Sequence, residues 1–173
     1  MKKILLILNF IFITLNSFGQ NHFIFNNLEI NGKVTNFIDK LTKNDRFKII
    51  GKIDENCHQL YGNFIGKDKC RINVINTPKT KIVCYVEVFL SEDIVENNLD
   101  KELHKWIEIY KKKYEEPVVD SLNNKGYVVF SNDLYKGGIK IYISGDSILA
   151  EYVDIENAKL KFKEDEEIIN EDI

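Results

Sequence analysis

Three cysteines and three histidines are the side chains of this chain best suited to chemistry. Cys57 and His58 are adjacent, and a nearby imidazolium lowers the pKa of a thiol, which favours a reactive thiolate. Adjacent residues of a strand point to opposite faces, so we do not expect these two side chains to meet. His104 and Glu108 are spaced i, i+4 on an expected helix, which could hold a metal, but charged helix faces also produce such pairs. We predict no metal site here.

The sequence lacks the short motifs that mark common catalytic sites. Gly137-Gly138 precedes an expected strand rather than opening a helix, so it does not form a phosphate-binding loop. The chain contains no Gly-x-Ser-x-Gly elbow, no His-Glu-x-x-His helix and no Cys-x-x-Cys pair. We therefore interpret the chain as a non-enzyme with no catalytic residue and no cofactor.

The first nineteen residues have the pattern of a cleaved signal peptide. Two lysines follow the initiating Met, and an apolar run over residues 4–15 comes next. This run is shorter than the about 20 apolar residues of a membrane span, so an uncleaved anchor is the lesser alternative. Ser17 and Gly19 are small residues at −3 and −1 of a cut between Gly19 and Gln20. The pattern predicts a periplasmic or secreted protein without a stable membrane span after cleavage.

The charge of the chain argues against nucleic acid as a partner. The formal net charge is −3, with 24 basic and 27 acidic side chains. The longest basic run, Lys111-Lys112-Lys113, lies beside acidic residues on an expected helix. Binding to phosphates requires clustered Lys and Arg, and this sequence shows no such cluster.

Apolar periodicity predicts two helices. The first carries the stripe Val34, Phe37, Ile38 and Leu41. The second runs from Leu99 to Tyr114, with Asn97 or Asn98 as its N-cap and Pro117 as its stop. Runs rich in Ile and Val predict strands over residues 23–30, 46–53, 60–65, 70–75, 82–90, 118–119, 127–130, 139–143 and 148–155.

This order predicts an α+β fold in which an antiparallel sheet and two helices form two similar halves. Each half consists of one helix followed by about four strands, so we interpret the halves as related. They cover about residues 23–91 and 97–157 of a single domain over 20–157. Residues 158–173 are acidic, and we expect a loosely ordered tail or a frayed helix there.

Two strand registers follow from the expected turns. A two-residue turn at Gly145-Asp146 places Ile143 opposite Ile148 and Lys140 opposite Glu151. In the first half, the same reasoning pairs Ile72 with Cys84 and Cys70 with Val86.

The odd number of cysteines leaves at least one thiol unpaired or one bridge to another chain. The predicted register puts Cys70 and Cys84 on a diagonal, where neighbours lie about 7–8 Å apart and out of disulfide reach. We therefore favour buried thiols at Cys70 and Cys84 over a Cys70–Cys84 bridge, and Cys57 is a further possible thiol or disulfide position.

Several short motifs resemble those of a family of small exported proteins from Gram-negative bacteria, mostly uncharacterised. The motifs are Leu28-Glu29-Ile30-Asn31-Gly32, the helix over 37–41, Leu60-x-Gly62-x-Phe64-x-Gly66 with Cys70, Lys113-Tyr114 with Pro117, Gly138-x-Lys140-x-Tyr142 and Tyr152-Val153-Asp154. Glu115 stands where relatives commonly have Gly, so the usual αL cap is not expected. The repeated helix-and-sheet order is also similar to that of the beta-lactamase inhibitor protein and of small outer-membrane assembly lipoproteins. These resemblances imply a sheet surface that binds another protein.

Two sites resemble the Asp-Ser-aliphatic acceptor of a bacterial O-glycosylation system. They are Asp120-Ser121-Leu122 and Asp146-Ser147-Ile148. Ser121 and Ser147 are therefore candidate glycosylation sites, although both tripeptides are also ordinary turn sequences.

The leading functional hypothesis is an exported soluble protein that binds a protein partner, not identified by the sequence, in the cell envelope. The alternative is a small-ligand carrier with an apolar cleft between the two halves. In that case the aromatic residues Phe64, Tyr85, Phe89 and Tyr142 would line the cleft.

Overall fold

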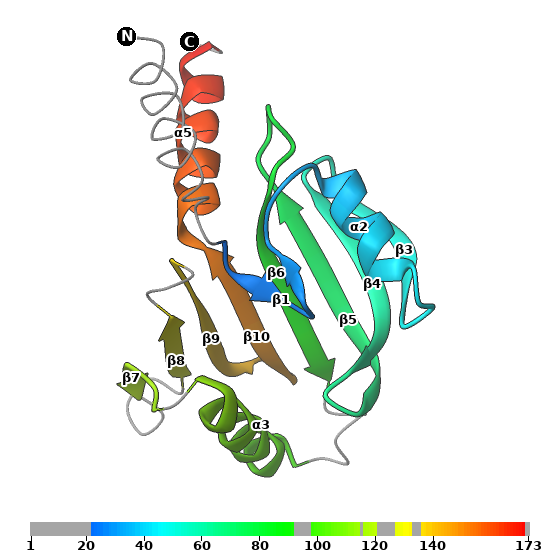
Figure 1. The fold of residues 1–173 in the computed structure, drawn as a ribbon, viewed down its shortest axis with the longest axis vertical. Helices are drawn as coiled ribbons and strands as arrows, with labels where there is room; N and C mark the ends of the chain where they lie inside the picture. The colour runs from blue at the N-terminus through cyan, green and yellow to red at the C-terminus, as the bar shows by residue number, and fades with distance from the viewer. Residues whose placement is uncertain (1–21, 92–97, 115, 121–126, 133–135, 172–173) are drawn as a thin grey trace, which may run out of the picture.

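The computed structural model describes residues 22–91, 98–114, 116–120, 127–132 and 136–171. Its main element is an antiparallel sheet in which eight strands follow the order β3-β4-β5-β6-β10-β9-β8-β7 (Figure 1). The strands are β3 (Phe47–Asp54), β4 (Cys57–Phe64), β5 (Lys67–Asn76), β6 (Val83–Ser91), β7 (Val119–Asp120), β8 (Tyr127–Asn132), β9 (Gly137–Ser144) and β10 (Ser147–Asp154). The expected α+β class is confirmed.

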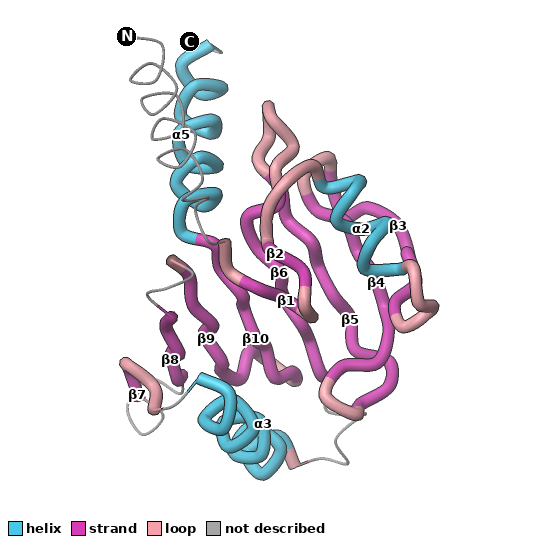
Figure 2. Tube along the Cα trace, viewed as in Figure 1, coloured by secondary structure: helices cyan, strands magenta, loops and turns pink. Residues whose placement is uncertain are grey.

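A small hairpin and two helices cover one face of this sheet. The hairpin pairs β1 (Ile24–Phe25) with β2 (Leu28–Glu29) and lies across the central strands (Figure 2). The helices on this face are α2 (Val34–Thr42) and α3 (Leu99–Tyr114). Their apolar stripes were predicted from the sequence, and the four stripe residues of α2 are indeed its buried ones. Asn98 caps α3, since its side-chain oxygen accepts a hydrogen bond from the backbone N–H of Lys101 at 3.1 Å.

Aromatic rings fill the space between the sheet and these elements. Phe25, Phe64 and Tyr152 contact one another, with the Phe25 and Tyr152 ring centroids 4.9 Å apart in an edge-to-face arrangement. Trp106 of α3 is fully buried and meets Phe64 edge-on. Buried aromatic side chains contribute large apolar areas, so this cluster is a major source of the stability of the fold.

In chain order α2 and α3 are each followed by four strands, and strands β6 and β10 join the two sets. The predicted β9–β10 register is confirmed, because Ile143 pairs with Ile148 and Lys140 with Glu151. The predicted β5–β6 register is wrong, because Ile72 pairs with Val88 and Val74 with Val86. The shift arises because the turn after β5 is a longer loop, closed by hydrogen bonds between Thr77 and Ile82, with an irregularity in β6 beside it.

A third helix, α5 (Ile155–Glu171), was not expected as a continuous element. Residues 158–171 belong to it, so they are not a loosely ordered tail. Asp154 caps the helix, because its carboxylate accepts hydrogen bonds from the Asn157 N–H at 3.0 Å and, at its other oxygen, from the Phe23 N–H at 2.9 Å. The buried residues of α5 are polar, Asn157 and Glu164. Hydrogen bonds rather than an apolar stripe therefore fix this helix, which is why hydrophobic periodicity did not predict it.

Glu164 attaches α5 to the turn between β5 and β6. Its carboxylate accepts hydrogen bonds from the backbone N–H groups of Lys79 (2.6 Å) and Thr80 (3.0 Å) and from the Thr80 hydroxyl (2.6 Å). Burial alone would raise the pKa of Glu164, but these hydrogen bonds outweigh burial and lower it. In the described part of the chain, no helix is both long and apolar enough to cross a membrane.

Candidate functional site

The second face of the sheet is the most extensive candidate surface. Alternate residues of a strand point to opposite faces, and Val86, Val88 and Leu90 of β6 lie in the covered core. Tyr85, Glu87 and Phe89 therefore point to the other face. Among the described elements, the hairpin, α2 and α3 pack on the first face (Figure 1), whereas α5 contacts the ends of β6 and β10. We call this second side the open face.

One row across the open face is aromatic and cationic. Paired positions on five neighbouring strands bring together Tyr61, Arg71, Phe89, Leu149 and Tyr142. The Arg71 guanidinium lies 4.3 Å from the centre of the Phe89 ring, a favourable cation–π distance. Leu149 is buried between Phe89 and Tyr142 although it is outside the main core cluster. This aromatic row therefore combines a small apolar surface around Leu149 with the positive charge of Arg71.

The next row across the same strands is polar. It consists of Gln59, Asn73, Glu87, Glu151 and Lys140, each paired with the next on the neighbouring strand. The Asn73 side-chain amide donates a hydrogen bond to Glu87 at 2.9 Å, and the Gln59 amide donates one to Asn73 at 3.4 Å. We call this set the polar row.

Two carboxylates lie at the centre of the polar row. Burial raises the pKa of Glu151, and the neighbouring Glu87 raises it further, while Lys140 acts in the opposite direction. A carboxylate pair with one raised pKa can accept hydrogen bonds from a cation or transfer a proton. Both carboxylates are half-buried, so the pair stays partly accessible to solvent rather than enclosed in a cleft that excludes water.

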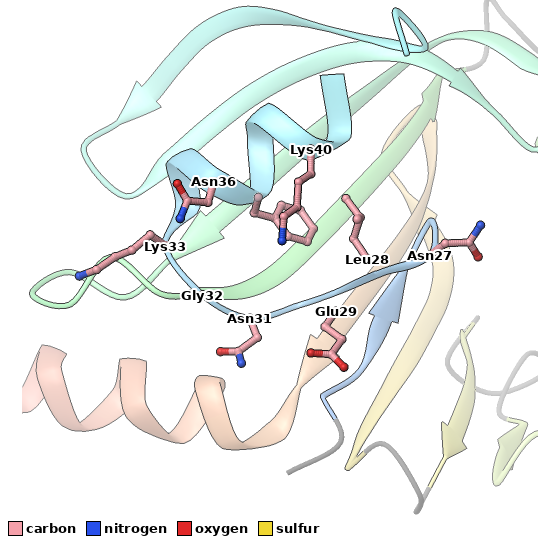
Figure 3. A pocket seen from close by; sticks show the side chains of 9 residues that line it. Asn27, Leu28, Glu29, Asn31, Gly32, Lys33, Asn36 and Lys40 are labelled. Carbon is pink, nitrogen blue, oxygen red and sulfur yellow. The ribbon is translucent and has the colours of Figure 1, made fainter. Parts of the chain in front are cut away.

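A polar pocket of about 390 Å³ lies between the β1–β2 hairpin and α2. Figure 3 shows that the polar ends of Asn27, Asn31 and Lys33 point in different directions. Lys33 donates to the backbone oxygen of Thr80 at 2.7 Å instead of to the pocket. These side chains therefore do not converge on one ligand position.

A second pocket, of about 220 Å³, is lined by both halves of the chain. We call it the inter-half pocket. The first half contributes Asn26, Asn27, Arg46, Phe64 and Ile65, and the second half contributes Ile109, Tyr110, Lys113 and Tyr152. Its aromatic wall contains a hydrogen bond between the hydroxyls of Tyr110 and Tyr152. Positive and apolar side chains thus meet in this small space.

The structure separates the four aromatic residues expected to line one cleft. Phe64 lies in the core of the covered face, whereas Tyr85, Phe89 and Tyr142 belong to the open face. Phe89 and Tyr142 are in the same row, and Tyr85 lies toward α5. These four side chains do not line a common cleft.

The three cysteines are free and buried in the structure. Burial raises the pKa of Cys57 and Cys70 to about 11 and that of Cys84 to about 12. Cys70 lies in the core cluster, but Cys84 lies outside it. The irregularity of β6 between Val83 and Tyr85 interrupts the alternation of the strand, so Cys84 does not share the core cluster with Val86 and Val88.

The histidines do not gather with other ligand types. His22 lies 3.0 Å from Asp154, His104 is exposed on α3, and burial lowers the pKa of His58. Within the described ranges, no group of three or more His, Cys, Asp or Glu side chains is placed to hold a metal ion. Cys57 pairs with Ile75 and His58 with Val74, on opposite faces of the sheet.

The remaining sequence-predicted sites are partly outside the described residues. Outside the described residues lie the signal segment 1–19, the cut between Gly19 and Gln20, Asn97, Glu115 and Ser121. Ser147 is described, and this residue is only 7% exposed. Its hydroxyl contacts Asp146 at 3.1 Å.

Sequence reasoning missed the Glu87–Glu151 pair and the inter-half pocket. Alternation in β6 could have placed Glu87 and Phe89 on one face, and the confirmed hairpin register already paired Lys140 with Glu151. The missing step was the pairing of β6 with β10, which joins segments distant in the sequence. No local pattern specifies such a partner.

No protein-family model matches the chain, and no curated protein and no solved structure matches it either. The function has therefore to be inferred from the geometry of the molecule itself.

Proposed function

We propose that this chain is an exported soluble protein that binds another protein through the open face of its sheet, without catalysis. The signal pattern over residues 1–19 supports export to the periplasm or beyond. The observation that carries the binding proposal is the pairing of two rows on the open face. An apolar, aromatic row lies directly beside a row that contains two opposed carboxylates.

The chemistry of the two rows defines the partner. Aromatic residues and arginine are enriched among the residues that dominate binding energy at protein interfaces, and Arg71, Phe89 and Tyr142 are of these types. A lysine or arginine of the partner would relieve the repulsion between Glu87 and Glu151. The partner should therefore present a basic side chain next to an apolar one.

The test uses the full chain expressed in a Gram-negative host and recovered from its envelope fraction. A partner captured by the wild type should be lost from Phe89→Ala and from the double variant Glu87→Gln/Glu151→Gln, with affinity at least about tenfold lower. Ile49→Ala and Glu108→Gln are matched controls, because both residues are exposed and outside the open-face rows. Capture that survives both open-face variants would refute the proposal.

Export itself has a separate test. The exported protein should begin at Gln20 by N-terminal sequencing, and its intact mass should show whether Ser121 or Ser147 carries a glycan. The low exposure of Ser147 favours Ser121 of these two candidates. Recovery of the uncut chain with the membrane fraction would contradict export as a free protein.

We also infer that the two halves are related. Each contributes one helix followed by four strands, and their central strands β6 and β10 pair antiparallel. In this interpretation the open face is a composite of both halves, so a partner would contact both.

A second candidate function is carriage of a small ligand. The observation that favours it is the inter-half pocket, which is lined by residues of both halves. Titration of the purified protein with small molecules tests this candidate independently of the open face.

A further inference from the structure

We propose that the inter-half pocket binds a small organic anion, a carboxylate or similar group carried on a compact apolar body. This inference rests on the second candidate function, carriage of a small ligand. It names the chemical class of that ligand.

The charge of the pocket lining supports an anion. Arg46 and Lys113 line the pocket, and no acidic side chain does. This lining is unusual in a chain whose formal net charge is −3. In the described part of the chain, neither Arg46 nor Lys113 has an ion-pair partner, although ten ion pairs are found there. Two cations without counter-ions in one concave site favour a negatively charged ligand.

Arg46 is held in place by uncharged groups. Its Nε donates to the backbone oxygen of Asn63 at 3.0 Å, and its Nη1 donates to the side-chain oxygen of Asn26 at 2.9 Å. These bonds fix the guanidinium without neutralising it. A guanidinium has five N–H donors, so others remain for a carboxylate.

The buried pair Tyr110 and Tyr152 provides a further hydrogen-bond donor. Tyr110 and Tyr152 are 3% and 5% exposed, and their hydroxyls share one hydrogen bond. Each hydroxyl has one proton, so the tyrosine that accepts this bond retains a proton of its own. Neither hydroxyl bonds any other group in the described structure. Burial keeps the pKa of both phenols high, so both stay protonated and able to donate.

The rest of the lining sets the size and character of the ligand. Phe64, Ile65 and Ile109 supply apolar surface. The volume of about 220 Å³ lies below the range of about 300–1,000 Å³ typical of pockets for drug-sized ligands. A single ring or a short aliphatic chain bearing one carboxylate fits this description.

The experiment titrates the purified protein with butyrate and benzoate and with their neutral counterparts butanol and benzamide, using calorimetry and chemical-shift changes. At least one carboxylate should bind at least about tenfold more tightly than its neutral counterpart. Arg46→Gln and Lys113→Gln should each weaken its binding about tenfold. Lys112→Gln, an exposed cation on the same helix and outside the pocket lining, should leave binding unchanged.

Tyr152→Phe removes one hydroxyl while preserving the ring, and it should weaken carboxylate binding more than binding of the neutral compound. Circular dichroism identifies any variant that fails to fold. If Tyr152→Phe fails to fold, the Arg46→Gln and Lys113→Gln variants still test the proposal, because both positions are exposed. Equal binding of neutral and anionic probes would overturn the anion class but leave ligand carriage standing. No binding of any probe at millimolar concentration would overturn both, without affecting the open-face proposal.

Discussion

Glu87 of β6 and Glu151 of β10 lie directly opposite each other on the two central strands of the sheet. Like charges in this position repel, at a cost of about 0.2–1 kcal/mol for an exposed cross-strand pair. The hydrogen bond from Asn73 to Glu87 and the charge of Lys140 beside Glu151 offset part of that cost. A destabilising pair at the centre of the open face is the kind of feature that a binding partner can relieve.

The first prediction concerns the stability of the isolated protein. Glu151→Gln should raise the free energy of unfolding near pH 7 by about 0.2–1 kcal/mol, because it removes a charge that burial and Glu87 disfavour. A carboxyl whose pKa is raised in the folded state contributes most to protein stability when the pH is below its ordinary pKa. This contribution is lost as the pH rises through the raised pKa. The advantage of the variant should therefore shrink toward pH 4.

Urea unfolding at several pH values measures this effect. Glu108→Gln on α3 is the control, since that carboxylate is exposed and belongs to a helix that packs on the other face of the sheet. An advantage of Glu151→Gln that is the same at both ends of the pH range would argue against the repulsion described here.

The second prediction concerns Glu164, whose replacement should destabilise the protein rather than stabilise it. Glu164→Gln should lower the free energy of unfolding near pH 7 by about 1–3 kcal/mol, because the charged carboxylate accepts hydrogen bonds from the turn at Lys79 and Thr80. Because the pKa of Glu164 is lowered in the folded state, its carboxylate contributes to stability at pH values above its ordinary pKa. This contribution is lost as the pH falls through the lowered pKa. The difference from wild type should therefore diminish in acid, whereas the exposed Glu166→Gln should change little at any pH.

The third prediction concerns the thiols. Cys57, Cys70 and Cys84 should resist iodoacetamide in the folded protein near pH 7, because burial raises their pKa to about 11 or 12 and leaves almost no thiolate. All three should react once the protein is unfolded without reductant. Mass spectrometry counts the added groups, and a pair of cysteines that reacts only after reduction would reveal a disulfide instead.

The fourth prediction uses two glycines of neighbouring strands. A Cβ on Gly62 would lie against the backbone carbonyl oxygen of Arg46, well inside normal contact, so Gly62→Ala should destabilise the fold by about 1–3 kcal/mol. Gly51→Ala adds the same atom where no other atom lies within 4 Å, so it should be nearly neutral. Thermal unfolding compares the two variants, and equal melting temperatures would show that the β3–β4 contact adapts.

Elements whose signal is local were predictable from the sequence. The apolar stripe of α2 and the β9–β10 hairpin depend on residues within one helix or one hairpin. The β5–β6 register failed because an irregularity and a longer loop shifted it by an even number of residues, which keeps each side chain on its face. Alternation cannot detect such a shift.

The candidate sites were less predictable because they are assembled from distant segments. Glu87 lies opposite Glu151 only because β6 pairs with β10. Arg46 and Tyr110 line the same pocket only because that pairing brings the two halves of the chain together. The helix α5 was missed for a different reason. Its buried side chains are an amide and a carboxylate, and a search for apolar stripes does not find them.

The seam between β6 and β10 also bears on the order of folding. Strands β3 to β6 and strands β8 to β10 are meanders whose neighbours are close in the sequence, so the chain closes only short loops to form them. The seam pairs Tyr85 with Val153 and Ser91 with Ser147, across much longer loops. We therefore expect the two meanders to form first and the seam to close last, so that both the open face and the inter-half pocket appear only in the final step.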